Sequence, residues 1–226
     1  MTQMAPDANH AIIVLAAGRS SRMGQHKLLL PLGEEPLVAH AVRAACASLA
    51  THVVVVLGHD AERVHAALPS GRYEPVVNPD YASGMASSLR AGLAALLAGT
   101  GATRTPSSPL GGVLITLADQ PLAAVGLLNA LLTAAATASP DAIIAASAAG
   151  LRGNPVYFPA LYFDELAQVR GDEGGRAVIV RHLDQLQLLD WPDTNVFLDV
   201  DQPGDYERVR ALWPRYSAAD RDDAGD

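Results

Sequence analysis

The sequence is poor in several features that would assign it to other protein classes. It holds a single cysteine, Cys46, so it cannot form an internal disulfide, and a disulfide-stapled secreted scaffold is excluded. Basic residues are outnumbered, with 16 Lys and Arg against 24 Asp and Glu, so the formal net charge is −8 and no nucleic-acid partner is expected. No run of about 20 apolar residues is present, so we expect no membrane span.

We also expect no targeting signal. The first ten residues contain no Lys or Arg, whereas a secretory signal peptide begins with positive charge. We therefore expect a cytoplasmic protein. Half of the 226 residues are hydrophobic and 18% are charged, which excludes a disordered chain.

Hydrophobic patterning predicts alternating strands and helices. Nearly all-apolar runs, typical of strands buried on both faces of a parallel sheet, occur at 11–16, 53–57, 113–117 and 142–145. Helical spacing occurs at 36–49, 60–68, 83–98 and 122–138. The alternation predicts a three-layer α/β/α fold with a mainly parallel mixed sheet.

The second half is less regular. We expect strands at 151–158, 185–189 and 196–198, and helices at 161–169, 175–182 and 203–212. The stretch 99–112, rich in Gly, Thr, Ser and Pro, predicts a surface connection. We expect one domain over residues 1–216 and a disordered acidic tail over residues 217–226, which hold four Asp and one Arg.

A glycine-containing loop, LAAGRSSRMGQHK, follows the first strand over residues 15–27. Its small residues let backbone amides approach a ligand, and Arg19, Arg22 and Lys27 add three positive charges without an acid. Amides and cations after a buried strand favour phosphate binding, although an ordinary turn with solvated charges is the alternative. The loop matches neither dinucleotide motif, GxGxxG or GxxxxGK[ST].

The longer stretch LAAGRSSRMGQHKLLLPLGEEPL, residues 15–37, resembles the opening signature of the MobA-like NTP transferases that attach a nucleotide to the molybdenum cofactor. Its LAAG turn resembles the molybdenum cofactor cytidylyltransferases, because the guanylyltransferases usually read LAGG there. The resemblance spans about residues 12–212 and implies a fold like that of nucleotide-diphospho-sugar transferases. It also implies a nucleotide site at Leu15, Ala16, Ala17, Gly18, Arg22 and Lys27, of which the last two neutralise phosphates.

A second segment, NPDYASGMASSLRAG over residues 78–92, begins as a turn and continues as a helix. Gly84 could approach a planar base, while Ser87 and Ser88 fall in the first helical turn. A simple capping motif is the alternative. The resemblance implies that Gly84 and Ser88 contact the nucleotide base.

Acidic residues follow two of the predicted strands. Asp119 ends the strand at 113–117, at the edge where ligands bind in parallel α/β sheets, and could hold Mg²⁺. Magnesium prefers a second carboxylate, and FLDVDQPGDY offers Asp199, Asp201 and Asp205. Helix capping explains Asp205 well, and Asp201 less well because a strand is expected before it. The resemblance implies that Asp119 and Asp201 bind magnesium.

Two polar, glycine-rich segments lie in the second half. The stretches RGNPVYF at 152–158 and RGDEGGR at 170–176 resemble those that receive molybdopterin in the family. Asn and Asp suit the amide-like edges of a pterin, and Arg suits its phosphate. The candidates are Arg152, Asn154, Asp172 and Arg176, with plain loop structure as the alternative; Asp172 could equally cap the helix at 175.

The hypothesis is therefore a Mg²⁺-dependent transfer of CMP from CTP to molybdopterin, with release of pyrophosphate and with Arg22, Lys27 and Asp119 as catalytic residues. Within the class, the enzyme could use GTP or act on a sugar or alcohol phosphate. Outside it, the same fold could be an NAD(P)H-dependent reductase or a carrier that hands molybdopterin to a molybdenum hydroxylase or its chaperone. Retention of the two acids argues against the reductase.

Overall fold

The computed structural model describes residues 9–20, 23–99 and 109–222, in which the strands gather into one large sheet and one small one. The large sheet has seven strands: β1 (His10–Ala16), β4 (His52–Leu57), β5 (Glu74–Val77), β6 (Gly112–Leu117), β7 (Ile143–Ala148), β8 (Leu151–Pro159) and β9 (Leu186–Asp190). Their order is β5-β4-β1-β6-β8-β7-β9. The small sheet pairs β2 (Pro31–Leu32) with β3 (Glu35–Pro36).

Strand directions confirm the predicted mainly parallel, mixed sheet. β1 pairs in parallel with β4 and β6, β4 with β5, and β7 with β9. β8 runs antiparallel to both of its neighbours, β6 and β7. Because β8 is reversed, its first residues lie at the same edge of the sheet as the carboxyl ends of β1 and β6.

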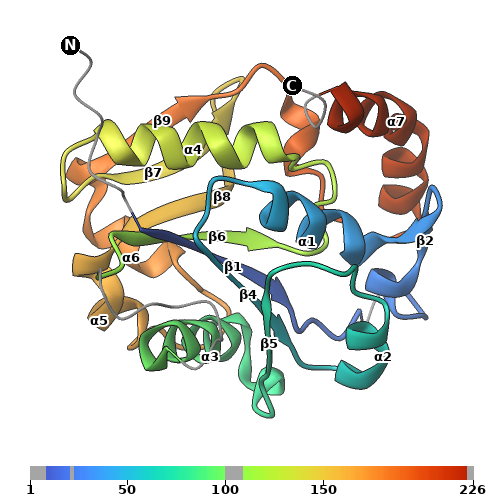
Figure 1. Ribbon diagram of the computed structural model, residues 1–226, viewed down its shortest axis with the longest axis horizontal. Coiled ribbons are helices and arrows are strands. Elements are labelled where there is room, and N and C mark those ends of the chain that lie inside the picture. Colours follow the sequence, from blue (N-terminus) through green and yellow to red (C-terminus); the bar gives the residue numbers. More distant parts are fainter. Residues whose placement is uncertain (1–8, 21–22, 100–108, 223–226) are drawn as a thin grey trace.

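Helices cover both faces of the sheet, as Figure 1 shows. One face carries α1 (Leu37–Ala47), α2 (Ala61–Ala66), α4 (Val125–Thr137) and α7 (Pro203–Asp222). The other carries α3 (Met85–Ala98), α5 (Phe163–Leu166) and α6 (Arg176–Arg181). In β1, Ile12 and Val14 pack into the first layer and Ile13 packs into the second, which explains why the strand is apolar throughout. The predicted three-layer fold is confirmed.

The structure corrects two expectations near the C-terminus. Residues 196–198 form no strand, because Thr194–Phe197 is a 3-10 turn (η5) whose cap, the Asp193 side chain, accepts a hydrogen bond from the Asn195 amide. The last helix, α7, runs from Pro203 to Asp222 and is longer than the helix expected at 203–212. Tertiary contacts favour this extension. The ring centroids of Trp213 and His40 are 4.0 Å apart, and the Tyr216 hydroxyl donates a hydrogen bond to Asp193.

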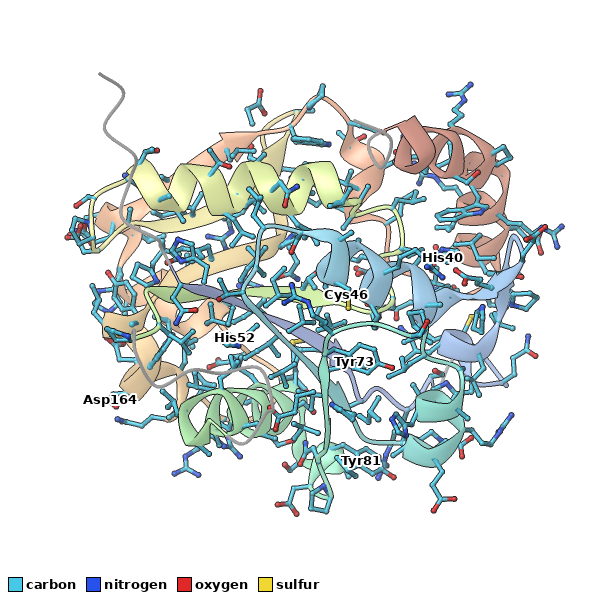
Figure 2. All side chains as sticks on the ribbon, viewed as in Figure 1. His40, Cys46, His52, Tyr73, Tyr81 and Asp164 are labelled. Carbon is cyan, nitrogen blue, oxygen red and sulfur yellow. The ribbon has the colours of Figure 1, made fainter. Side chains whose placement is uncertain are left out.

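The single cysteine, Cys46, packs against the core. It lies on α1, partly buried against the core, beside Tyr73 in Figure 2. Burial raises the pKa of its thiol, which favours the neutral form and a packing role. In the described part of the chain, no helix has the length and apolar character needed to cross a bilayer.

A buried histidine makes the fold sensitive to acid. His10 begins β1; its Nδ1 lies 2.9 Å from the Tyr157 hydroxyl, and its Nε2 has no hydrogen-bond partner among the described residues. Burial lowers the pKa of His10, so the folded state favours the neutral ring. The resulting stability is present above the unfolded pKa of about 6.5 and is lost as the pH falls below it.

We therefore expect His10→Leu to flatten the fall in unfolding free energy between about pH 7.5 and about pH 5.5. His10 contributes at most about 1.4 kcal/mol per pH unit to that slope. Urea unfolding at both pH values measures it, with the exposed His65→Leu as the matched control. Equal slopes in His10→Leu and wild type would contradict the assignment.

Candidate active site

Three distant segments of the chain meet at Lys27, which is the only lysine in the sequence. Lys27 opens a 3-10 turn, η1 (Lys27–Leu29), after the glycine-containing loop. Its Nζ donates to Asp119 Oδ2 at 2.6 Å and to Asp201 Oδ1 at 2.7 Å. The sheet order explains the meeting, because Lys27 follows β1 and Asp119 follows the adjacent strand β6.

The cation of the cluster is more buried than its two carboxylates. The Lys27 side chain is 9% exposed, against 22% for Asp119 and 46% for Asp201. Burial lowers the pKa of Lys27, but the charges and hydrogen bonds of Asp119 and Asp201 outweigh burial and raise that pKa above its ordinary value. Lys27 is therefore a permanent cation at neutral pH, held by two carboxylates.

The two carboxylates form a donor set that suits a hard divalent cation. Both direct an oxygen at the single Nζ position of Lys27, so one cation can contact both acids. Magnesium takes one or two carboxylates and completes its shell with water and phosphate oxygens. Among the described residues, no group of three or more His, Cys, Asp or Glu side chains could hold a metal by itself. The protein thus offers two ligands, and a phosphorylated substrate would supply others.

A cavity of about 390 Å³ surrounds this cluster. Its lining includes these residues of the sequence prediction: Leu15, Ala16, Gly18, Lys27, Asp119, Asp172 and Asp201. Gly18 has open space where a side chain would stand, which leaves its backbone accessible to a ligand. Arg22 lies outside the described residues.

Ala17 and Ser88 line neither this cavity nor the larger one beside it. Ala17 is buried; its carbonyl accepts from the His59 amide, because Gly58 brings the loop after β4 within contact. Ser88 is buried too, and its hydroxyl accepts from Asn78 Nδ2 at 3.0 Å. As positioned here, both support the loops around the cavity.

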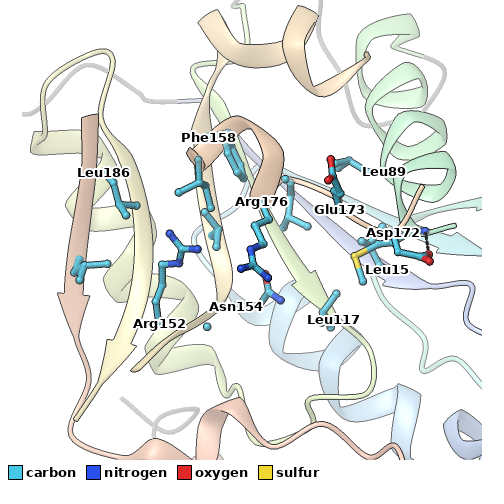
Figure 3. A pocket seen from close by; sticks show the side chains of 18 residues that line it. Leu15, Leu89, Leu117, Arg152, Asn154, Phe158, Asp172, Glu173, Arg176 and Leu186 are labelled. Carbon is cyan, nitrogen blue, oxygen red and sulfur yellow. Dashed lines mark hydrogen bonds between the residues drawn. The ribbon is translucent and has the colours of Figure 1, made fainter. Parts of the chain in front are cut away.

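The four predicted second-substrate residues come together in the adjoining cavity of about 650 Å³. Figure 3 shows Arg152, Asn154 and Arg176 directed into it, with Leu117 and Leu186 among its apolar lining. Arg152 and Asn154 come from the first residues of β8, and Arg176 from the first residue of α6. The cavity thus combines two guanidinium groups with an apolar floor, which suits a flat molecule carrying an anionic group.

The two cavities share three lining residues, Leu15, Met85 and Asp172. Asp172 Oδ1 accepts from the Met85 amide at 3.3 Å, and Gly171 O accepts from the Ala86 amide at 2.9 Å. Asp172 therefore holds the start of α3, and the sequence alternative of a cap on the helix at 175 is wrong. Gly84, at φ 108°, stands between these segments, since a Cβ there would lie 2.5 Å from the Gly171 backbone.

Comparison with known proteins assigns the chain to a family. The profile of the MobA-like NTP transferase domain matches residues 12–186. The chain belongs to this family. The purine catabolism protein PucB of Bacillus subtilis is 32% identical over 206 residues, which are 88% of this chain and 94% of that protein. Nicotine blue oxidoreductase of Paenarthrobacter nicotinovorans is 32% identical over 198 residues, 84% and 90% of the two chains.

Among solved structures, Rv0371c from Mycobacterium tuberculosis in complex with manganese is similar to this MobA-like protein. Its TM-score is 0.72 at 27% identity, with 90% of this chain and 98% of that chain covered. The agreement extends over nearly the whole described fold.

One residue beside the acids of this MobA-like site, Gln120, was not among the candidates from the sequence, and Asp199 was named only as a possible second carboxylate. Gln120 Nε2 donates to Asp199 Oδ1 at 2.8 Å. Asp199 is exposed as a residue, yet loss of hydration around its carboxylate and the charge of Asp119 raise its pKa to about 6. The only signal in the sequence was their position next to Asp119 and Asp201. Asp205 accepts from the amides of Asp201 and Gln202, which confirms its capping role.

Proposed function

We propose that the protein is a nucleotidyltransferase that moves CMP from CTP to the terminal phosphate of molybdopterin and releases pyrophosphate. The observation that carries this is the Lys27–Asp119–Asp201 cluster, which lies in a small cavity adjoining a larger, arginine-bearing one. Membership of the MobA-like family supports nucleotidyl transfer. The choice of CTP rests on the LAAG turn, and the choice of molybdopterin on the combination of apolar floor, Asn154 and two arginines.

The chemistry needs positioning more than acid–base catalysis. An oxygen of the acceptor phosphate attacks the α-phosphorus of the nucleotide, and the bond from that phosphorus to the β-bridging oxygen breaks. Pyrophosphate leaves with the electron pair. The attacking oxygen is already anionic, so no general base is required, and the rate depends on alignment and charge neutralisation. Arg152 and Arg176 would hold the acceptor.

Lys27 and the two acids would bind the triphosphate, the acids through a divalent cation. A bound divalent cation supplies positive charge to the phosphate oxygens, and Asp119 and Asp201 would hold it; we propose Mg²⁺. The manganese complex of a similar structure supports a divalent cation. Within the described residues, Asp119 and Asp201 use two of the three N–H donors of Lys27. The third N–H donor of Lys27 is available for a phosphate oxygen, and Arg22 would also neutralise the phosphates.

One relative favours a second candidate function. Nicotine blue oxidoreductase is named for a redox reaction, so an NAD(P)H-dependent reductase is the rival activity. Hydride transfer has no use for two carboxylates gathered on one cation, which is why nucleotidyl transfer is preferred. The third candidate function is a carrier that binds the pterin and catalyses no reaction.

A single set of assays separates these functions. The purified protein is supplied with Mg²⁺, NADPH and each of the four nucleoside triphosphates in turn, with either molybdopterin or a sugar phosphate as the acceptor. Pyrophosphate release is measured beside NADPH oxidation. We expect release that requires both the pterin and CTP. Release with GTP would make it a guanylyltransferase, and release with sugar phosphates alone would change the acceptor. NADPH oxidation without pyrophosphate, or pterin binding without either product, would overturn the proposal.

A further inference from the structure

The two acid-bearing segments of the site are joined to each other by a pair of hydrogen bonds. One is between backbones, from the Val200 amide to the Asp119 carbonyl at 3.0 Å. The other is between side chains, from Gln120 Nε2 to Asp199 Oδ1 at 2.8 Å. Each bond links the turn after β6 to the segment before α7, so together they set the position of one segment relative to the other.

Lys27 Nζ also bridges Asp119 and Asp201, but it does so from the tip of a flexible side chain. Asp205 accepts from the amides of Asp201 and Gln202, but it belongs to the first turn of α7 and fixes Asp201 only relative to that helix. Asp119 is held through its own turn, where the Ala118 amide donates to Leu15 O of β1. Without the two cross-links, each acid would be well placed on its own element, but the distance between the carboxylates would be less constrained.

Gln120 is an unusual residue for the position that it holds. It is 3% exposed, and its Oε1 has no hydrogen-bond partner among the described residues. A buried amide with one half unpaired destabilises a fold relative to an apolar side chain of the same size. Gln120 is therefore poorly explained by packing alone, and within the described structure the hydrogen bond of its side-chain amide goes to Asp199.

We infer that Gln120 and Asp199 form a positioning pair that holds the Asp201 carboxylate against Asp119, and so sets the geometry of the cation site. The inference rests on the proposed role of Asp119 and Asp201 as ligands of a divalent cation. Lys27 Nζ donates to Asp119 and Asp201, and Gln120 and Asp199 bond to each other, so the pair orients the site through the placement of Asp201. The charge of Asp199 also interacts with Lys27, which is why the test separates charge from hydrogen bonding. Residues that orient metal ligands typically change metal affinity about 10- to 100-fold when replaced.

The test uses replacements that separate the hydrogen bond from charge. Gln120→Met keeps the volume and removes the donor, and Asp199→Ala removes the acceptor. Asp199→Asn removes the charge but keeps an oxygen for Gln120. Gln202→Met, an exposed position in the same segment, is the matched control. Thermal unfolding shows that each variant is folded.

The first measurement needs no metal. Lys27 is the only lysine, so acylation of its ε-amine, followed peptide by peptide by mass spectrometry, reports how firmly the two carboxylates hold it. We expect several-fold faster labelling in Gln120→Met and Asp199→Ala, and wild-type rates in Asp199→Asn and Gln202→Met. The double variant Gln120→Met/Asp199→Ala should label no faster than either single variant, because both remove the same bond.

The second measurement is the binding of Mn²⁺ alone, followed by the electron paramagnetic resonance of the free ion. We expect the dissociation constant to rise about 10- to 100-fold in Gln120→Met and Asp199→Ala only. Unchanged labelling in Gln120→Met, or an Asp199→Asn variant as impaired as Asp199→Ala, would overturn the inference. If wild type binds no Mn²⁺ while labelling responds as expected, the metal role in the proposed function fails and the positioning pair stands.

Discussion

Replacing Asp119 with alanine is expected to reduce pyrophosphate release by about 10³-fold or more while the protein stays folded. Asp119 is one of two carboxylates that Lys27 Nζ contacts, at 2.6 Å, and it is the less exposed of the two. Its removal leaves the proposed cation with one carboxylate ligand in place of two, so the cation that neutralises the triphosphate is held less firmly. Turnover is measured at saturating nucleotide and acceptor, so that weaker binding does not mimic a lower rate.

Folding should survive the change, because Lys27 keeps Asp201 as its ion-pair partner. Asp119→Asn tests the charge of this residue by itself, because its amide oxygen can still accept a hydrogen bond from Lys27 but carries no charge. Asp164→Asn is the matched control: Asp164 is exposed on α5, at the far end of the sheet, as Figure 2 shows. Near-normal turnover in Asp119→Ala would remove the metal role from this residue.

Replacing Lys27 with methionine is expected to lower turnover about 10²- to 10³-fold. The variant keeps most of the side-chain volume but leaves no ammonium to neutralise the departing pyrophosphate. It also leaves Asp119 and Asp201 facing each other without a cation between them. We expect a loss of about 1–2 kcal/mol in the free energy of unfolding, less than for a fully buried pair because Asp201 is 46% exposed to water.

The same variant provides a test that does not depend on activity. If the two carboxylates form a divalent-cation site, Mg²⁺ should raise the thermal midpoint of Lys27→Met more than that of wild type, because the cation relieves the repulsion that Lys27 normally offsets. Arg63→Met, which removes an exposed cation from an i,i+3 pair, is the control and should show the wild-type response. An equal response in all three proteins would count against a cation site at Asp119 and Asp201.

Local pattern was enough to predict the sheet and most of its helices. The strands β1, β4 and β6 are apolar throughout because helices cover both faces, and that burial is visible in the sequence as an unbroken apolar run. The sequence also indicated that Asp119 and the loop at 15–27 each follow a strand, but it did not predict the contact between Lys27 and Asp119. The gathering of Arg152, Asn154, Asp172 and Arg176 in one cavity agrees with the family resemblance.

Other features depended on partners that no local pattern reveals. Residues 196–198 carry an apolar, strand-like pattern, but the cap from Asp193 makes the preceding residues a 3-10 turn. Local pattern predicts that the last helix ends at residue 212, yet contacts of Trp213 and Tyr216 with residues far away in the sequence extend α7. Ser88 lies in the first turn of a helix, where the sequence suggested contact with a ligand. The structure shows that it is buried and that its hydroxyl accepts a hydrogen bond from Asn78.

The sequence by itself determined the fold class, and it predicted a phosphate-binding loop at 15–27 with acids nearby, because hydrophobic period and residue type are local properties. The tertiary structure decided which groups face each other. It placed the single lysine between Asp119 and Asp201, and it joined Gln120 to Asp199. Such contacts follow from strand order and from the crossing of distant segments, and no periodicity along the chain encodes them.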